Sequence, residues 1–169
     1  MTYHLERVWP SPTEASRDEV VQFWLAESAL PDRTVARERA HQLVLVARDS
    51  SHRIAGVSTG LPMYVDRLGF ECLFYRMYVG RAHRTIGLHS TGLGWRILQE
   101  SYRLLNERFR SGCDRNMRGI YMEIENPSVM KVRNDAIWQE NGMNVVFIGR
   151  TPDGRHMRVW YFDGARIPR

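Results

Sequence analysis

A segment rich in cationic and small residues runs from Tyr78 to Ser90, where an apolar run ends and a helical pattern begins. Arg81 and Arg84 offer guanidinium donors, and Gly87 lets the backbone approach a bound group closely. A helix N-terminus presents unpaired N–H groups and a partial positive charge. We therefore expect a diphosphate to be held at this junction, with the Ser90 hydroxyl as a further donor.

Carboxylates form the second group of candidate residues. Glu71 stands at the start of one strand-like run, while Tyr121, Glu123 and Glu125 share one face of another by the two-residue period of a strand. Such a face would suit a cationic amine, and like charges at short range can raise a carboxyl pKa enough for proton transfer. We predict Glu71 or Glu123 as a general base and Tyr121 as a proton donor. A solvated carboxylate is the alternative interpretation of Glu71 and Glu125.

Apolar periodicity predicts the elements that position these residues. Strands are expected at 3–9, 43–47, from 53, and at 70–79, 119–125, 144–150 and 155–163. The longest helix has an apolar stripe over 93–109. Other helices are expected after Ser11 and Asp32, which act as N-caps, and from Asn126 to Gly142. Pro12 would then be the first residue of the first helix.

Composition limits the class of protein. The 169 residues suit a single domain, 1–169, and 43% hydrophobic with 25% charged residues is ordinary for a folded chain. No stretch approaches the roughly 20 apolar residues of a membrane helix. His4, Glu6 and Arg7 interrupt the apolar run that an export signal needs, so we expect a cytoplasmic protein. With two cysteines, Cys72 and Cys113, and no metal-ligand spacing, we expect neither a disulfide nor a metal.

The net charge of +5 comes from arginine, since Lys131 is the only lysine. Guanidinium forks suit phosphate and carboxylate groups, which favours an acidic ligand. A solvated arginine-rich surface is the alternative interpretation.

The loop resembles that of the GNAT superfamily of acyltransferases. There the acyl-coenzyme A loop reads Arg/Gln-x-x-Gly-x-Gly/Ala after a strand that ends in Val, and residues 84–89 follow this pattern except that His89 replaces a small residue. The order of elements agrees along nearly the whole chain. The resemblance implies acetyl-coenzyme A, or another short acyl-coenzyme A, as cofactor. The residues it implies for cofactor binding are Met77, Tyr78, Val79, Arg81, Arg84, Thr85, Ile86, Gly87, Leu88, His89 and Ser90.

The resemblance also implies a fold. It is an α/β (α+β) fold with a mixed, mostly antiparallel sheet of about seven strands flanked by about four helices. The fourth and fifth strands would splay, and the pantetheine arm would bind the backbone of Met77 to Val79. Glu71 resembles the strand glutamate of the histone-modifying branch. Trp138 stands where many members have a proton-donating Tyr, which leaves Tyr121, Tyr78 or water for that step.

We predict a transferase, an acyl-coenzyme A-dependent N-acyltransferase and most simply an N-acetyltransferase, in which a bound amine attacks the thioester directly. The amine could belong to a small molecule or a macromolecule. One alternative is a catalytically inactive acyl-coenzyme A sensor or scaffold of the same fold, for which Trp138 and His89 argue. Another is that the arginine-rich surface binds nucleic acid. The apolar last hairpin could serve a homodimer, and no membrane partner is expected.

Overall fold

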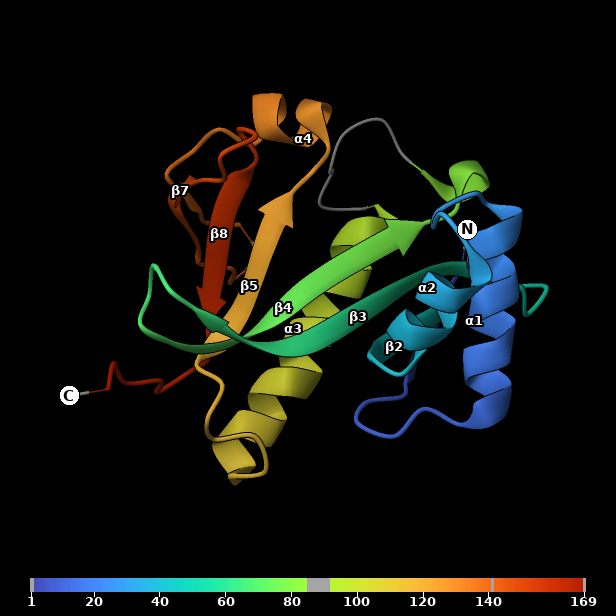
Figure 1. Cartoon of the computed structure of the whole chain (residues 1–169), viewed down its shortest axis with the longest axis horizontal. Helices are drawn as coiled ribbons and strands as arrows, with labels where there is room; N and C mark the ends of the chain where they lie inside the picture. The colour runs from blue at the N-terminus through green and yellow to red at the C-terminus, as the bar shows by residue number, and fades with distance from the viewer. Residues whose placement is uncertain (1, 85–91, 141, 169) are drawn as a thin grey trace. The chain divides into compact units, whose positions relative to one another are not determined.

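The computed structural model describes residues 2–84, 92–140 and 142–168. Its eight described strands form one sheet in the order β1-β2-β3-β4-β5-β8-β7-β6. Strands β4 and β5 are parallel, whereas the β1–β2, β2–β3, β5–β8, β7–β8 and β6–β7 pairs are antiparallel. The predicted mixed, mostly antiparallel sheet with four α-helices is therefore confirmed (Figure 1). In chain order the elements are β1 (His4–Arg7), α1 (Glu14–Ala26), α2 (Arg33–Ala40), β2 (Leu43–Arg48), β3 (Ile54–Val65), β4 (Phe70–Val79), the 3-10 helix η1 (Arg81–His83), α3 (Leu93–Ser111), β5 (Gly119–Ile124), α4 (Pro127–Val132), β6 (Ile137–Trp138), β7 (Val145–Arg150) and β8 (His156–Tyr161).

The chain divides into two compact units. One consists of Met1–Gly60 with Met77–Ser101, and the other of Leu61–Arg76 with Tyr102–Arg169. Strands β3 and β4 and helix α3 are each divided between the two units, with one part of the element in the first unit and the rest in the second.

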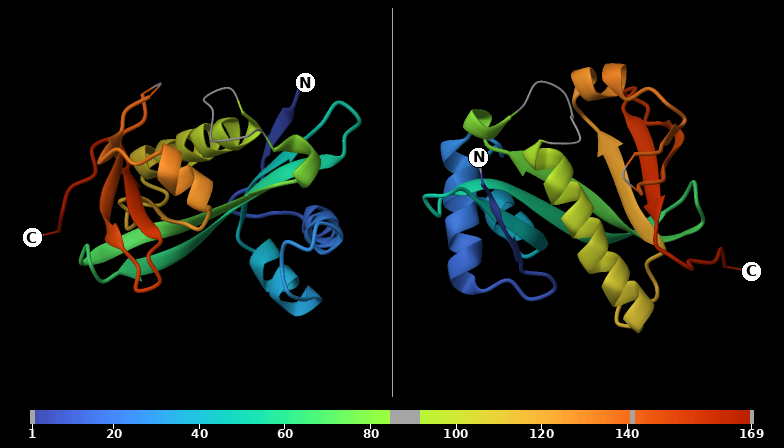
Figure 2. Two further views of the ribbon diagram at one scale, coloured as in Figure 1. Left: turned by 90° about the horizontal axis from the view of Figure 1, so that it is seen from above. Right: turned by 180° about the vertical axis from the view of Figure 1, so that it is seen from behind.

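The core of the first unit lies between helices α1 and α2 and strands β2 and β3. Figure 2 shows the two helices side by side, and their apolar faces meet the buried side chains of the strands. Val20 and Trp24 lie one helical turn apart on α1 and are 0% and 2% exposed. The predicted aliphatic strand is also buried, with Leu43 and Val46 in the same core. Because one face of α1 is buried, its apolar residues recur at the helical period, and the sequence predicts the helix from that period.

The two helix starts of this unit differ in how well they were predicted. The Asp32 carboxylate accepts a 2.9 Å hydrogen bond from the backbone N–H of Val35, so Asp32 caps α2 as predicted. Helix α1 begins at Glu14, two residues later than predicted, because Thr13 and not Ser11 is its N-cap. Thr13 Oγ1 accepts from the Ser16 N–H at 3.1 Å.

The second unit is built on the two faces of β5 and β8. On one face, Tyr102 of α3 stacks on Trp160 with ring centroids 3.7 Å apart. On the other face, Tyr121 and Val159 are buried with Phe70 and Cys72. Strand β5 is thus covered on both sides over its first residues, so its side chains are firmly oriented.

The segment after β5 corrects the predicted last helix. Helix α4 covers only Pro127–Val132, and Ile137–Trp138 forms the additional strand β6, paired with β7. Trp138 is 3% exposed, and its ring lies under the Arg158 guanidinium at 4.2 Å. Arg158 also donates to the backbone carbonyls of Arg133 and Asp135, at 3.1 and 2.8 Å. These tertiary contacts end the helix early, and local periodicity did not reveal them.

Candidate active site

Tyr121 and Glu123 are joined on one face of β5 in the second unit. Tyr121 is 2% exposed, and its ring lies 5.7 Å from that of Phe74 on the neighbouring strand β4. Its hydroxyl donates a hydrogen bond to Glu123 Oε1 at 2.9 Å. The two-residue period of the strand therefore placed these side chains together, as predicted.

The Glu123 carboxylate is held from its other side by Arg155, just before β8. Arg155 Nη1 lies 2.9 Å from Glu123 Oε2, while its Nε donates to Asp153 at 2.8 Å. Glu125, the second carboxylate of the predicted face, is 3.7 Å from Arg155 with a side chain 75% exposed. The ion pair with Arg155 orients Glu123 so that its Oε1 faces Tyr121, whereas the Glu125 side chain is largely exposed to solvent.

Burial raises the pKa of the Tyr121 phenol well above its usual value, and the hydrogen bond to Glu123 raises it further. The positive charges of Arg155 and Arg67 oppose this rise without cancelling it. The phenol therefore stays protonated near neutral pH. It can give its proton to Glu123 while its oxygen accepts another, which makes the pair a short proton relay.

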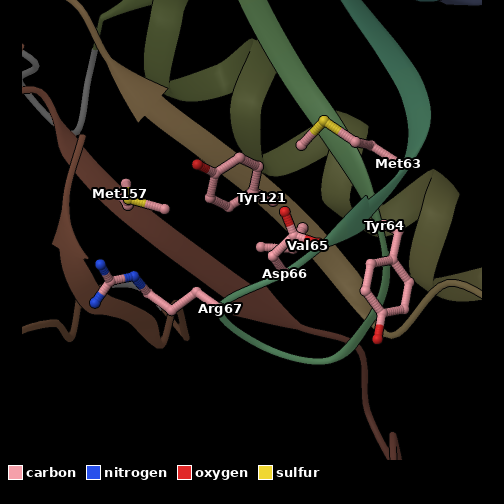
Figure 3. Close-up of a pocket in the computed structure, with 7 residues that line it drawn as sticks. All are labelled: Met63, Tyr64, Val65, Asp66, Arg67, Tyr121 and Met157. Carbon is pink, nitrogen blue, oxygen red and sulfur yellow. The ribbon is translucent and has the colours of Figure 1, made fainter. Parts of the chain in front are cut away.

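Tyr121 also lines an open pocket of about 590 Å³ in the same unit. Figure 3 shows its ring between the methionine side chains, with the Arg67 guanidinium beside Met157. Apolar walls and a few polar groups are the usual make-up of a small-molecule site. The lining residues are Met63, Tyr64, Val65, Asp66, Arg67, Tyr121 and Met157.

Glu71 lies on the opposite face of the sheet from this pair. Phe74 is the register partner of Tyr121, and Glu71 precedes Phe74 by three residues, so its side chain points the other way. The Arg118 N–H donates to the Glu71 carbonyl at 3.0 Å, five residues before Glu123 on the neighbouring strand. At ~3.3 Å per residue, about 16 Å of strand separates the two carboxylates. The structure therefore does not bring the two candidate bases together, and Glu71 is exposed.

In the first unit, the end of β4 meets the first turn of α3. A Cβ at Gly94 would lie 3.4 Å from Met77 Cε and 3.6 Å from Val79 Cγ2, which is ordinary van der Waals contact, so the first turn of α3 packs beside this strand end. Arg84 folds back across this strand end. Its Nε donates to the Val79 carbonyl at 2.9 Å, and its guanidinium lies 4.9 Å from the centre of the Tyr78 ring.

Glu27 connects this strand end to helix α1, although it was not among the site residues predicted from the sequence. Its Oε2 accepts from the Arg81 N–H at 3.0 Å and from the Tyr78 hydroxyl at 3.3 Å, and its backbone carbonyl accepts from Arg81 Nη2 at 2.9 Å. An acidic residue at a helix C-terminus opposes the helix dipole. That mismatch is the sequence signal that could have pointed to Glu27.

Six of the predicted cofactor residues, Thr85, Ile86, Gly87, Leu88, His89 and Ser90, lie outside the described residues. Among the residues that the structure does describe, no three histidine, cysteine or acidic side chains are grouped as a metal site would require. The same part of the chain contains no helix with the length and apolar character to cross a membrane.

Cys72 is fully buried, and burial raises the pKa of its thiol to about 11. A thiol with this pKa is a poor nucleophile near neutral pH, because the thiolate is the reactive form. Cys72 is therefore poorly suited to act as a nucleophile in the folded protein.

Comparison of the sequence with protein-family models and with curated proteins finds no match. Solved structures do match. An acetyltransferase of the GNAT family from Streptococcus pneumoniae has a TM-score of 0.53 and 13% identity over 95% of this chain and 99% of that chain. Tetrahymena GCN5 has a TM-score of 0.54 and 10% identity, over 95% of this chain and 96% of that chain. The ribosomal-protein-S18-alanine N-acetyltransferase of Escherichia coli has a TM-score of 0.50 and 14% identity, over 94% of this chain and 91% of that chain. At these identities the likeness is one of fold.

Proposed function

We propose that this chain, whose fold is that of the GNAT acetyltransferases, is an acyl-coenzyme A-dependent N-acyltransferase acting as one domain. The acyl donor is acetyl-coenzyme A or another short acyl-coenzyme A. The observation that carries the proposal is the 2.9 Å hydrogen bond from Tyr121, which lines a pocket in this fold, to Glu123.

The reaction needs a proton to leave the amine and another to reach the leaving sulfur. The amine nitrogen attacks the thioester carbonyl, a C–N bond forms, and the C–S bond breaks to give an amide and a thiolate. The amine proton passes to the Tyr121 oxygen while the phenol proton moves to Glu123. Reversal of this relay delivers a proton to the thiolate, so the pair is regenerated and free thiol is released.

The cofactor side of the proposal rests on the first unit. The backbone of Met77 to Val79 would bind the pantetheine arm, and Arg81, Arg84 and residues 85–90 would hold the diphosphate at the start of α3. The packing of the first turn of α3 beside Met77 and Val79 supports this placement. Because Arg84 donates to the Val79 carbonyl, it would have to release that carbonyl before the arm could bind there.

The test is release of free coenzyme A thiol from acetyl-coenzyme A with a panel of amines. The wild type should release thiol with at least one amine, and Glu123→Gln should reduce turnover by about 100-fold or more. Glu125→Gln is the matched control, since Glu125 lies on the same face with a side chain 75% exposed, and it should retain activity.

Acetyl-coenzyme A binding without thiol release from any amine would instead support the alternative function, an inactive sensor or scaffold. Trp138 no longer argues for that alternative, because it is a buried core residue of β6 and not part of the last helix.

A further inference from the structure

The pocket beside Tyr121 carries one charge of each sign on its wall. Asp66 and Arg67 follow one another in the turn between β3 and β4, and both line the pocket. Within the described residues neither side chain forms an ion pair. By contrast, Glu123 already has a cationic partner, because its carboxylate lies 2.9 Å from Arg155, which also pairs with Asp153 at 2.8 Å. The pocket therefore offers a carboxylate and a guanidinium that a ligand could pair with.

The guanidinium of Arg67 is placed by a feature of β7. Gly149 stands at an irregularity in the β7–β8 register, with φ at +140°. A Cβ at this position would lie 2.9 Å from Arg67 Nη1, so the glycine makes room for the guanidinium. Arg67 Nη1 also donates to the Ile148 carbonyl at 3.4 Å. One nitrogen is thus directed to the backbone, and the remaining N–H groups are available to a ligand.

The rest of the lining is neutral and adaptable. Met63 and Met157 supply flexible apolar walls, and the phenol of Tyr121 is kept protonated by its buried setting. A doubly charged phosphate would meet the repulsion of Asp66, whereas a group with one negative and one positive charge matches both wall residues. Guanidinium and carboxylate pair with two parallel hydrogen bonds.

Building on the proposed function, we propose that the acceptor is an amine that also carries a carboxylate, such as an amino acid, whose carboxylate pairs with Arg67 while its amine reaches Tyr121. Arg67 is then a specificity residue, since it holds a part of the acceptor that does not react. Asp66 attracts the protonated amine into the pocket before it gives up its proton.

Methionine and methioninamide form a suitable pair of acceptors, because they share a side chain that fits the apolar walls and only methionine carries a carboxylate. In the thiol-release assay, the wild type should prefer methionine by about 10- to 100-fold in kcat/KM, as expected for hydrogen bonds to a charged group. Arg67→Gln should bring the ratio of the two kcat/KM values close to one, because only the acid loses a partner for its carboxylate. Arg150→Gln is the control, since Arg150 is an exposed residue of the same unit outside the pocket.

A second measurement does not depend on turnover. N-acetylmethionine should raise the melting temperature of the wild type, N-acetylmethioninamide should not, and Arg67→Gln should lose the response to the acid. Equal effects of acid and amide, or an unchanged preference in Arg67→Gln, would overturn the inference. Stabilisation by the acid with no thiol release from any amine would retain the pocket assignment and reject acyl transfer, so the two failures are distinguishable.

Discussion

Tyr121 and Glu123 are joined by a 2.9 Å hydrogen bond on one face of β5, with Arg155 closing the other side of the carboxylate at 2.9 Å. Tyr121 lines a pocket, whereas Glu123 is not among the lining residues of that pocket. Under the proposed function, the amine proton would pass from a ligand in the pocket to the phenol while the phenol proton moves to Glu123.

Tyr121→Phe should remove this relay and leave the packing against Phe74 intact. We expect kcat to fall by about 100-fold or more, which is the usual contribution of a positioned acid or base, with KM for the acyl donor nearly unchanged. The lost hydrogen bond should cost only about 1 kcal/mol of unfolding free energy. Steady-state kinetics with urea unfolding of the same samples checks both values, and full activity of the variant would rule out the relay.

Glu71→Gln should behave differently, because Glu71 is exposed on the opposite face, about 16 Å along the strand from Glu123. We expect kcat/KM within about twofold of the wild type, as for an ordinary surface substitution. If Glu71→Gln lost activity and Glu123→Gln kept it, the base would have to be reassigned to Glu71.

Much of the fold could be predicted from the sequence because long elements with one buried face carry a clear period. The α3 stripe is an example, with Ile97 and Leu105 at 0% and 1% exposure. The predicted extent of the last helix was wrong because the packing of Trp138 on Arg158 determines the structure of that segment. Those two residues meet only in the folded chain. The start of α1 was misplaced because Ser11 and Thr13 are both good caps, and the hydrogen bond to Ser16 selects Thr13.

The candidate site was predictable only within single strands. The period of β5 placed Tyr121 and Glu123 together, and the structure agrees. Arg155 could not be found in this way, since it reaches Glu123 only through the pairing of β5 with β8. The face of Glu71 relative to Tyr121 likewise depends on the register between two strands, which periodicity within one strand does not give.

The two cysteines should differ sharply in how fast they react with a thiol reagent. Cys113 is exposed, whereas Cys72 is buried with a pKa of about 11, so only about one Cys72 thiol in a thousand is ionised at pH 8. We expect one fast-reacting thiol in the native protein and two in urea. Cys72→Ala should retain acyl transfer. If the variant folded but had lost this activity, an acyl-enzyme intermediate on Cys72 would have to be considered.

His156 should make the protein sensitive to acid. Burial lowers its pKa below the ordinary value of 6.5, with the charges of Arg150 and Arg158 acting in the same direction. Below pH 6.5 the unfolded chain takes up a proton that the folded chain refuses, so this contribution to stability is complete above pH 6.5 and is lost as the pH falls toward the folded pKa. Urea midpoints at pH 7.5 and 5.5 should therefore differ more in the wild type than in His156→Phe.

His41→Gln is the control for this comparison, because His41 is exposed. Its acid sensitivity should equal that of the wild type. An equal loss of stability in His156→Phe would show that other groups account for the pH dependence.

The most direct test of the central claim is calorimetric titration of the folded protein with acetyl-coenzyme A, beside Gly87→Glu and the exposed control Arg37→Glu. A carboxylate in the loop should repel the diphosphate, so we predict saturable binding by the wild type and the control, and binding weaker by at least about tenfold in Gly87→Glu. Absence of binding by the folded wild type, or equal binding by Gly87→Glu, would contradict an acyl-coenzyme A site at this loop.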